Sequence, residues 1–170
     1  MIKTLHTSSA PAAIGPYSQG KIVDGFLFAS GQIAINPANG NIEDDTIEGQ
    51  TKRVCENIAA ILKEAGADFD SVIKTTCFLK NISDFGAFNE IYGEYFSSKP
   101  ARSCVGVGDL PKTALVEVEI IANNICTAVR QAPSEMRRHY PRGFVFFALN
   151  SRQLPVFVET ACPQPIFSPL

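Results

Sequence analysis

The stretch Pro100-Ala101-Arg102-Ser103-Cys104-Val105-Gly106-Val107 places one arginine at the start of a short apolar run, between two small residues. A second stretch, Leu115-Val116-Glu117-Val118-Glu119-Ile120-Ile121, alternates strictly and carries two carboxylates. Such runs predict strands. The Arg102 guanidinium can give a carboxylate two parallel hydrogen bonds, and a glutamate on what we expect to be the neighbouring strand can move a proton. Together the two stretches predict a sheet that carries a site for a small anionic substrate.

Glu117 and Glu119 share one face of their predicted strand. Two interpretations remain open at this point. On a solvent-exposed face the two carboxylates would carry no function. On a face that lines a cleft, Glu117 would stand close to a substrate, and the apolar alternate positions would then form the core.

The preceding chain predicts two hairpin strands, a helix, a strand and a second helix. Asp24-Gly25 is a two-residue turn signal between the two hairpin strands. Val54, Ile58, Ile61 and Leu62 recur at helical spacing, and Gly66 suits a helix end. The expected elements are strands 21–24 and 26–33, helix 46–65, strand 72–80, helix 85–96, and strands 101–107 and 114–122.

This order, β-β-α-β-α-β-β, predicts an α+β fold with both helices on one face of the sheet. Two helices cannot cover both faces, yet the second face keeps apolar residues. We therefore expect that face to pack against another copy of the chain, in a homo-oligomer of closed symmetry. Polar residues on it would then lie in a cleft between subunits.

Composition narrows the functional classes. The net charge is −2, and residues 1–122 hold 10 basic and 15 acidic side chains, which argues against nucleic acid as the main partner. No apolar run is long enough for a membrane span, and the N-terminus lacks the apolar core of a signal peptide. Five cysteines without metal-ligand spacing fit reduced thiols, so we expect a cytoplasmic protein without a bound metal.

Residues 123–170 differ in character from residues 1–122. All their basic residues are arginines, and two apolar runs, 144–149 and 154–158, stand apart from any helical period. We therefore expect a domain at 1–122 and an irregular C-terminal extension at 123–170, either packed on the domain or poorly ordered. No motif in the extension indicates a second catalytic domain.

Five motifs, in the same order along the chain, resemble the RidA family (the YjgF/YER057c/UK114 superfamily). They are Ile14-Gly15-Pro16-Tyr17-Ser18-Gln19, Ser30-Gly31-Gln32-Ile33, Lys74-Thr75-Thr76-Cys77-Phe78-Leu79, Pro100-Ala101-Arg102-Ser103-Cys104, and Leu110-Pro111-Lys112 with Val116-Glu117-Val118-Glu119. The likeness runs from about Lys3 to Ala122 and stops where the extension begins.

The resemblance implies a chorismate-mutase-like fold, a homotrimer with active sites between subunits, and 2-iminobutanoate/2-iminopropanoate deaminase activity. That activity hydrolyses reactive enamines and imines to 2-oxo acids and ammonia. The family's arginine matches Arg102. Its partners match Tyr17, Ser30, Gly31, Asn89, Cys104 and Glu117.

On this hypothesis Arg102 grips the substrate carboxylate, Glu117 handles the attacking water or its proton, and Tyr17 closes the cleft. Ser30, Gly31, Asn89 and Cys104 complete the binding site. An imine is already electrophilic, so no cofactor is required. The alternative is a binding protein, a translation inhibitor with ribonuclease activity or a chaperone-like module, and a third possibility is a degenerate copy whose extension blocks trimer assembly.

Overall fold

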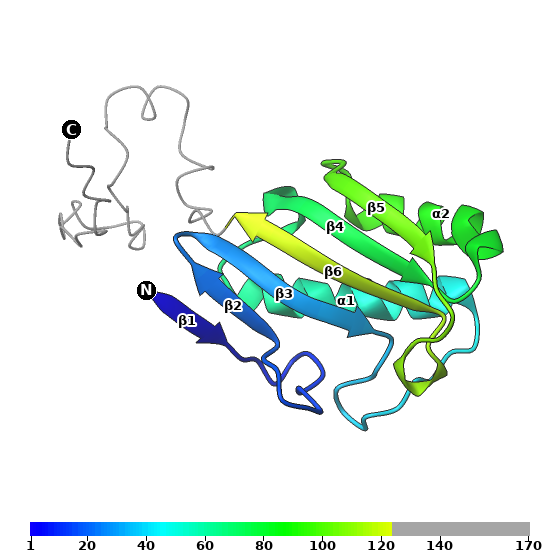
Figure 1. Ribbon diagram of the computed structural model, residues 1–170, viewed down its shortest axis with the longest axis horizontal. Helices are drawn as coiled ribbons and strands as arrows, with labels where there is room; N and C mark the ends of the chain where they lie inside the picture. Colours follow the sequence, from blue (N-terminus) through cyan, green and yellow to red (C-terminus); the bar gives the residue numbers. More distant parts are fainter. Residues whose placement is uncertain (124–170) are drawn as a thin grey trace, which may run out of the picture. The chain divides into compact units, whose positions relative to one another are not determined.

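A computed structural model describes residues 1–123 of the chain as one six-stranded sheet and two helices (Figure 1). The predicted α+β class is confirmed. The extension predicted at 123–170 lies outside the described residues, apart from Asn123, which ends the last strand. The helices are α1 (Ile47–Glu64) and α2 (Phe85–Tyr95), with 3₁₀ turns at Phe69–Ser71, Ile82–Asp84 and Pro111–Thr113. The strands are β1 (Ile2–Leu5), β2 (Gly20–Val23), β3 (Phe26–Ile33), β4 (Val72–Leu79), β5 (Ala101–Gly106) and β6 (Val116–Asn123).

The predicted elements are all present, with ends shifted by at most two residues, and one further strand was missed. That strand, β1, pairs antiparallel with β2 at the edge of the sheet. Its four residues give no clear alternation, because only Leu5 is buried. The hairpin at Asp24-Gly25 is confirmed, since both residues adopt the positive φ angles of a two-residue turn.

The strand order is β1-β2-β3-β6-β4-β5. β6 pairs antiparallel with both β3 and β4, while β5 pairs parallel with β4 at the far edge. The expectation that Arg102 and Glu117 stand on neighbouring strands is therefore wrong. β4 lies between β5 and β6. Because β6 pairs with one edge of β4, β5 can pair only with the opposite edge.

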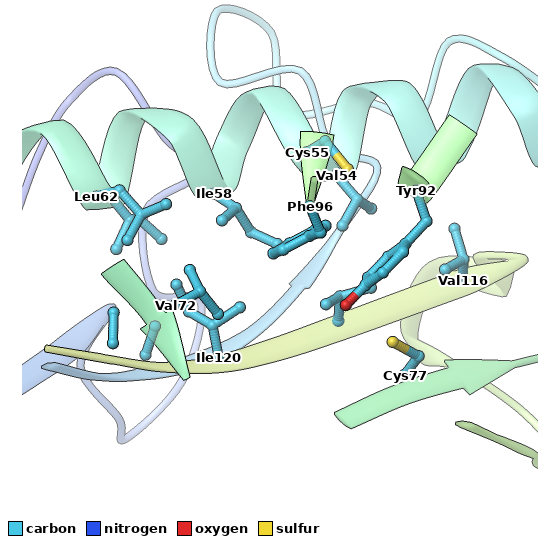
Figure 2. Packing of buried hydrophobic residues seen from close by; sticks show 14 of the residues in the cluster. Val54, Cys55, Ile58, Leu62, Val72, Cys77, Tyr92, Phe96, Val116 and Ile120 are labelled. Atoms are coloured by element: carbon cyan, nitrogen blue, oxygen red, sulfur yellow. The ribbon is translucent and has the colours of Figure 1, made fainter. Parts of the chain in front are cut away.

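Both helices cover the same face of the sheet, as predicted (Figure 1). Thr46 caps α1 by accepting a hydrogen bond from the Gly49 N–H, and α1 presents Val54 and Ile58 to the sheet. Figure 2 shows Val54 and Ile58 together with Tyr92 of α2 and Phe96 directly after it. These side chains pack against residues of β4 and β6, between the helices and the sheet.

The opposite face of the sheet has no covering element within residues 1–123. It exposes large apolar side chains, among them Phe28, Ile73 and Val105, each about 45% accessible. Burying apolar surface of this kind is favourable, so the face suits a partner surface. None of the helices formed by these residues is long and apolar enough to cross a bilayer.

Candidate active site

Arg102 lies on the helix-covered side of β5. In the parallel pair of β4 and β5, Thr75 stands opposite Arg102 and Cys77 stands opposite Cys104. Thr75 and Cys77 are both buried beneath the helices. Paired residues of neighbouring strands point to the same side, so Arg102 and Cys104 also face α2. Both are partly accessible, because β5 is the edge strand.

Helix α2 holds the guanidinium of Arg102 by one hydrogen bond and an aromatic wall. Arg102 Nη1 donates a hydrogen bond to Asn89 Oδ1 at 2.8 Å. Its Cζ lies 4.8 Å from the ring centre of Tyr92, 5.4 Å from that of Phe85 and 5.8 Å from that of Phe88, all within cation–π range. Within residues 1–123, no carboxylate forms an ion pair with Arg102. A fixed cation without a counter-charge in its own domain is suited to an anionic ligand.

Cys104 lies beside this cation and carries a thiol rather than a thiolate at neutral pH. Burial raises the pKa of Cys104, and the positive charge of Arg102 offsets part of that effect. Cys55 and Cys77 are free and buried, and burial raises the pKa of Cys77 to about 12. Cys104 therefore lines the site as an uncharged side chain and is not suited to act as a nucleophile.

A groove of about 480 Å³ opens elsewhere on the domain and collects four of the other predicted site residues. Tyr17, Ser30, Gly31 and Glu117 line it, together with Glu119 and apolar residues of the 11–14 loop. On β6, Glu117 and Glu119 alternate with Val116, Val118 and Ile120, which are buried against the helices. The two glutamates therefore point to the uncovered face, and the interpretation that their face lines a cleft is confirmed.

A bulge in β3 brings the backbone of Gly31 against the carboxylate of Glu117. The register between β3 and β6 shifts between Ala29 and Gln32, so Ser30 and Gly31 oppose a single residue of β6. A Cβ atom at position 31 would stand 1.8 Å from Glu117 Oε1 and 2.7 Å from its Cδ. Glycine at position 31 therefore lets the Glu117 carboxylate occupy the space that a side chain would otherwise take.

The environment of Glu117 favours its protonated form. Burial raises the pKa of its carboxyl, and the nearby negative charge of Glu119 raises it further. A carboxyl with a raised pKa is a stronger base once ionised, and it also keeps a proton to give at a higher pH. Glu117 therefore has the properties of a group that accepts and returns a proton.

The loop that carries Tyr17 is fixed by a residue that the sequence interpretation missed. Gln19 is 3% accessible, and its amide pairs only with backbone groups of the loop. Its Oε1 accepts from the Thr7 N–H at 2.7 Å, and its Nε2 donates to the carbonyls of Thr7, Ala10 and Pro11 at 3.0, 3.2 and 2.8 Å. A glutamine directly before a strand gives no sequence signal of this role, because its partners are backbone atoms.

The predicted site residues thus form two separate groups. Arg102, Asn89 and Cys104 lie together on the helix side of the β5 edge, and Tyr17, Ser30, Gly31 and Glu117 lie together on the uncovered face. The β4–β6 register confirms the separation, since Glu117 is opposite Phe78, one position from the buried Cys77. One copy of residues 1–123 does not place Arg102 beside Glu117.

A larger cavity, of about 720 Å³, contains none of the predicted residues. Its lining includes Glu43, Asp44, Asp45 and Lys112 from two exposed loops. Side-chain and backbone hydrogen bonds from Thr46 lower the pKa of Asp44, so this carboxylate is engaged in helix capping. Within the described residues no group of three histidine, cysteine or acidic side chains is arranged to hold a metal ion.

The family model described as Endoribonuclease L-PSP matches residues 7–124. The chain belongs to this family. The match spans every predicted site residue and ends where the extension begins. It agrees with the RidA-type motifs, since solved relatives include a protein of the Rid family and the YjgF gene product of E. coli.

Several members of the L-PSP family are close relatives with different names. A Lactococcus lactis protein named "Putative regulator AldR" is 63% identical over 71% of this chain and 97% of its own length. A rat protein named 2-iminobutanoate/2-iminopropanoate deaminase is 46% identical over 71% of this chain and 88% of its own. The crystal structure of E. coli TdcF with bound serine superposes with a TM-score of 0.68, at 40% identity, over 71% of this chain and 98% of that one.

Proposed function

We propose that this protein hydrolyses small 2-imino acids and their enamine tautomers, such as 2-iminobutanoate and 2-iminopropanoate, to 2-oxo acids and ammonia. A water oxygen bonds to the imine carbon while the π electrons move to nitrogen, which takes up a proton. The resulting carbinolamine then loses ammonia: its nitrogen takes up a second proton as the C–N bond breaks, and its hydroxyl gives up a proton as the C=O bond of the 2-oxo acid forms. The mammalian relatives named as deaminases of these two substrates support the proposal.

The observation that carries the proposal is the state of Arg102. Its guanidinium is hydrogen-bonded to Asn89, lies within cation–π distance of three aromatic rings, and forms no ion pair with any carboxylate of residues 1–123. A planar fork held in this way suits the carboxylate shared by all 2-imino acids. The TdcF relative, whose structure holds serine, is consistent with a small amino-acid-like ligand.

We further propose that the complete site forms between copies of the chain in a homotrimer. Arg102 and Glu117 occupy opposite faces of one sheet, so a second copy is needed to bring the two groups together. The uncovered face, with Phe28, Ile73 and Val105, supplies the apolar surface for such an interface. The free thiols of Cys55 and Cys77 fit a reducing compartment such as the cytoplasm.

Apart from Cys104, each predicted residue then has a proposed role. Arg102 binds the substrate carboxylate, and Asn89 orients it. Glu117, seated over Gly31, accepts a proton from the attacking water and returns it to the departing nitrogen. Ser30 is fixed by donating to the Ser18 carbonyl at 2.6 Å, which ties the bulge to the Tyr17 loop. Tyr17, half exposed at the groove, closes over the substrate.

A coupled assay tests the proposal directly. A threonine dehydratase generates 2-iminobutanoate, and the rate of 2-oxobutanoate formation is followed with and without this protein. Arg102→Ala should lower the acceleration by roughly 10²–10⁴-fold, the range expected when positioning and proton transfer are lost. Arg53→Ala is the matched control, because Arg53 is a partly exposed arginine paired with Glu56 on α1. Full activity of Arg102→Ala, or no acceleration by the native chain, would refute the proposal.

The family description gives ribonuclease activity as a second candidate. The charge of residues 1–122, with 10 basic against 15 acidic side chains, opposes binding to a polyanion. A salt titration of RNA binding and cleavage, with the full chain, separates the two functions. Cleavage that survives Arg102→Ala and falls steeply with salt would favour the ribonuclease.

A further inference from the structure

Among the three rings near Arg102, Tyr92 is the closest, and it is anchored by a hydrogen bond. Tyr92 is 7% accessible, and its hydroxyl shares a 2.9 Å hydrogen bond with Thr75 Oγ1. Thr75 is the β4 residue directly opposite Arg102 on β5. A short chain of contacts therefore runs from Thr75 through the Tyr92 ring to the Arg102 guanidinium, and it joins the two strands through α2.

The chemistry of Tyr92 suits a neutral support and not an acid or base. Burial raises the pKa of Tyr92 to about 12, so the phenol stays protonated at neutral pH. Its hydroxyl is already occupied by Thr75, and its ring is shielded by Phe96, whose ring stacks on it with centres 4.2 Å apart. What Tyr92 offers to Arg102 is one flat π-face.

A flat support matters because an arginine side chain has many rotamers. A free guanidinium loses this freedom when it binds a carboxylate, and the loss weakens binding. In this structure the guanidinium carbon lies 4.8 Å from the centre of the Tyr92 ring, and Nη1 donates to Asn89, so both contacts restrict the rotamers open to Arg102. The guanidinium N–H groups that do not donate to Asn89 are then preorganised to bind a ligand.

We infer that Tyr92, anchored by Thr75, is a positioning residue that fixes the plane of Arg102 for a small 2-oxo or 2-imino carboxylate. The inference rests on the proposed function, since it assumes that Arg102 receives the substrate carboxylate. Tyr92 itself acts only through Arg102. Phe85 and Phe88, farther from the guanidinium, complete the wall.

The test is calorimetric binding of 2-oxobutanoate, the product of the proposed reaction, to the full-length chain. Tyr92→Leu removes the ring and should weaken binding about tenfold. Tyr92→Phe removes the shared hydrogen bond, and Thr75→Val removes that bond together with the weak 3.9 Å bond from Cys77 Sγ. Each should weaken binding by roughly twofold to fivefold. The Tyr92→Phe/Thr75→Val double variant should be no weaker than either single one, because the two changes delete the same bond.

Phe96→Leu is the matched control for loss of a core ring. Phe96 is as buried as Tyr92 and stacks on it, but its ring is not among those beside Arg102. We expect its affinity to stay within about twofold of the native chain. An equal loss in Phe96→Leu and Tyr92→Leu would reduce the role of Tyr92 to core packing and overturn the inference.

A double-mutant cycle of Tyr92→Leu with Arg102→Lys measures the coupling between the two residues in binding affinity. A purely structural role of Tyr92 would give no such coupling. Lysine lacks the planar fork, so Tyr92→Leu should add less than about a twofold loss in that background. Fully additive losses would overturn the inference. In the imine assay, Tyr92→Leu should raise KM by a larger factor than it lowers kcat.

The outcome also separates this inference from the proposed function. A native chain that binds 2-oxobutanoate in a Tyr92-dependent way, yet does not accelerate imine hydrolysis, refutes the deaminase and supports the positioning role. A native chain that does not bind 2-oxobutanoate overturns the positioning role. If Tyr92→Leu does not fold, Tyr92→Phe and Thr75→Val decide, and unchanged affinity in both refutes the anchoring.

Discussion

Arg102 and Glu117 lie on opposite faces of one sheet, and β4 separates their strands. Arg102 faces α2, where Asn89 and Tyr92 hold it, while Glu117 faces the uncovered side over Gly31. Neither side chain can cross the sheet to meet the other. Chemistry that needs both groups therefore needs two copies of the chain, and this requirement makes the proposed assembly testable.

Mixing two inactive variants should restore activity. We expect Arg102→Ala and Glu117→Gln each to be inactive alone, because each removes one half of every shared site. When the two chains are co-expressed and assemble at random, about one site in four combines an intact Arg102 with an intact Glu117. The deaminase assay on the mixture should then give roughly a quarter of the native rate.

The control for this experiment is the double variant Arg102→Ala/Glu117→Gln co-expressed with either single variant. No site in that mixture can hold both groups, so it should stay inactive. Absence of recovery in the mixture of single variants, with subunit exchange verified by mass spectrometry, would contradict a site shared between copies.

Gly31→Ala should displace the carboxylate of Glu117. The added Cβ would stand 1.8 Å from Oε1, so the side chain has to move away. We expect the rate to fall by about 10–10²-fold, because a displaced base loses its alignment with the water. Gly93→Ala on α2 is the control, since no atom lies near its added Cβ. That variant should keep full activity and gain about 0.5–1 kcal/mol in the free energy of unfolding.

The pH dependence should report the raised pKa of Glu117. The ionised carboxylate is the base, so the acid-side fall of kcat/KM should lie at a higher pH than an unperturbed glutamate would give. Glu119→Gln removes the neighbouring negative charge and should move this acid limb to lower pH. An acid limb that is unchanged in Glu119→Gln, while Glu117→Gln abolishes activity, would contradict the coupling between the two groups.

The same shift has a consequence for stability. A carboxyl whose pKa is higher in the folded state adds stability below its unfolded pKa and loses it as pH rises through the folded value. Glu117→Gln lacks this dependence. Its advantage in free energy of unfolding over the native chain should therefore grow as pH rises from 4 to 7, as measured by urea unfolding. An advantage that is constant with pH would contradict the shift.

Gln19→Ala should loosen the loop that carries Tyr17. It leaves buried backbone groups of Thr7, Ala10 and Pro11 without their partner, which should cost about 1–3 kcal/mol in urea unfolding and raise KM. Gln50→Ala removes another buried glutamine, bonded to the Asp44 carbonyl and the Leu115 N–H, away from the groove. It should lose similar stability with KM unchanged. An equal rise of KM in both variants would show a general and not a local effect.

Local patterns were enough to predict most of the fold. The spacing of Val54 and Ile58 predicted α1, the alternation around Glu117 predicted β6, and Asp24-Gly25 predicted the hairpin, because each pattern is fixed by neighbours along the chain. β1 escaped prediction, since only Leu5 of its four residues is buried and the sequence therefore shows no alternation. The residue pattern itself indicated Arg102 and Glu117, the other site residues came from the family resemblance, and all their roles remain proposals.

The sequence by itself determined which elements form, which of their faces are apolar, and which side chains could bind an acid or move a proton. Only the tertiary structure decided that β6 inserts between β3 and β4, that Arg102 and Glu117 face opposite ways, and that Gln19 and Tyr92 support them. The physical reason is the distance along the chain over which each interaction acts. Periodicity and capping act over a few residues, whereas strand order and the partners of buried polar groups depend on contacts between distant segments.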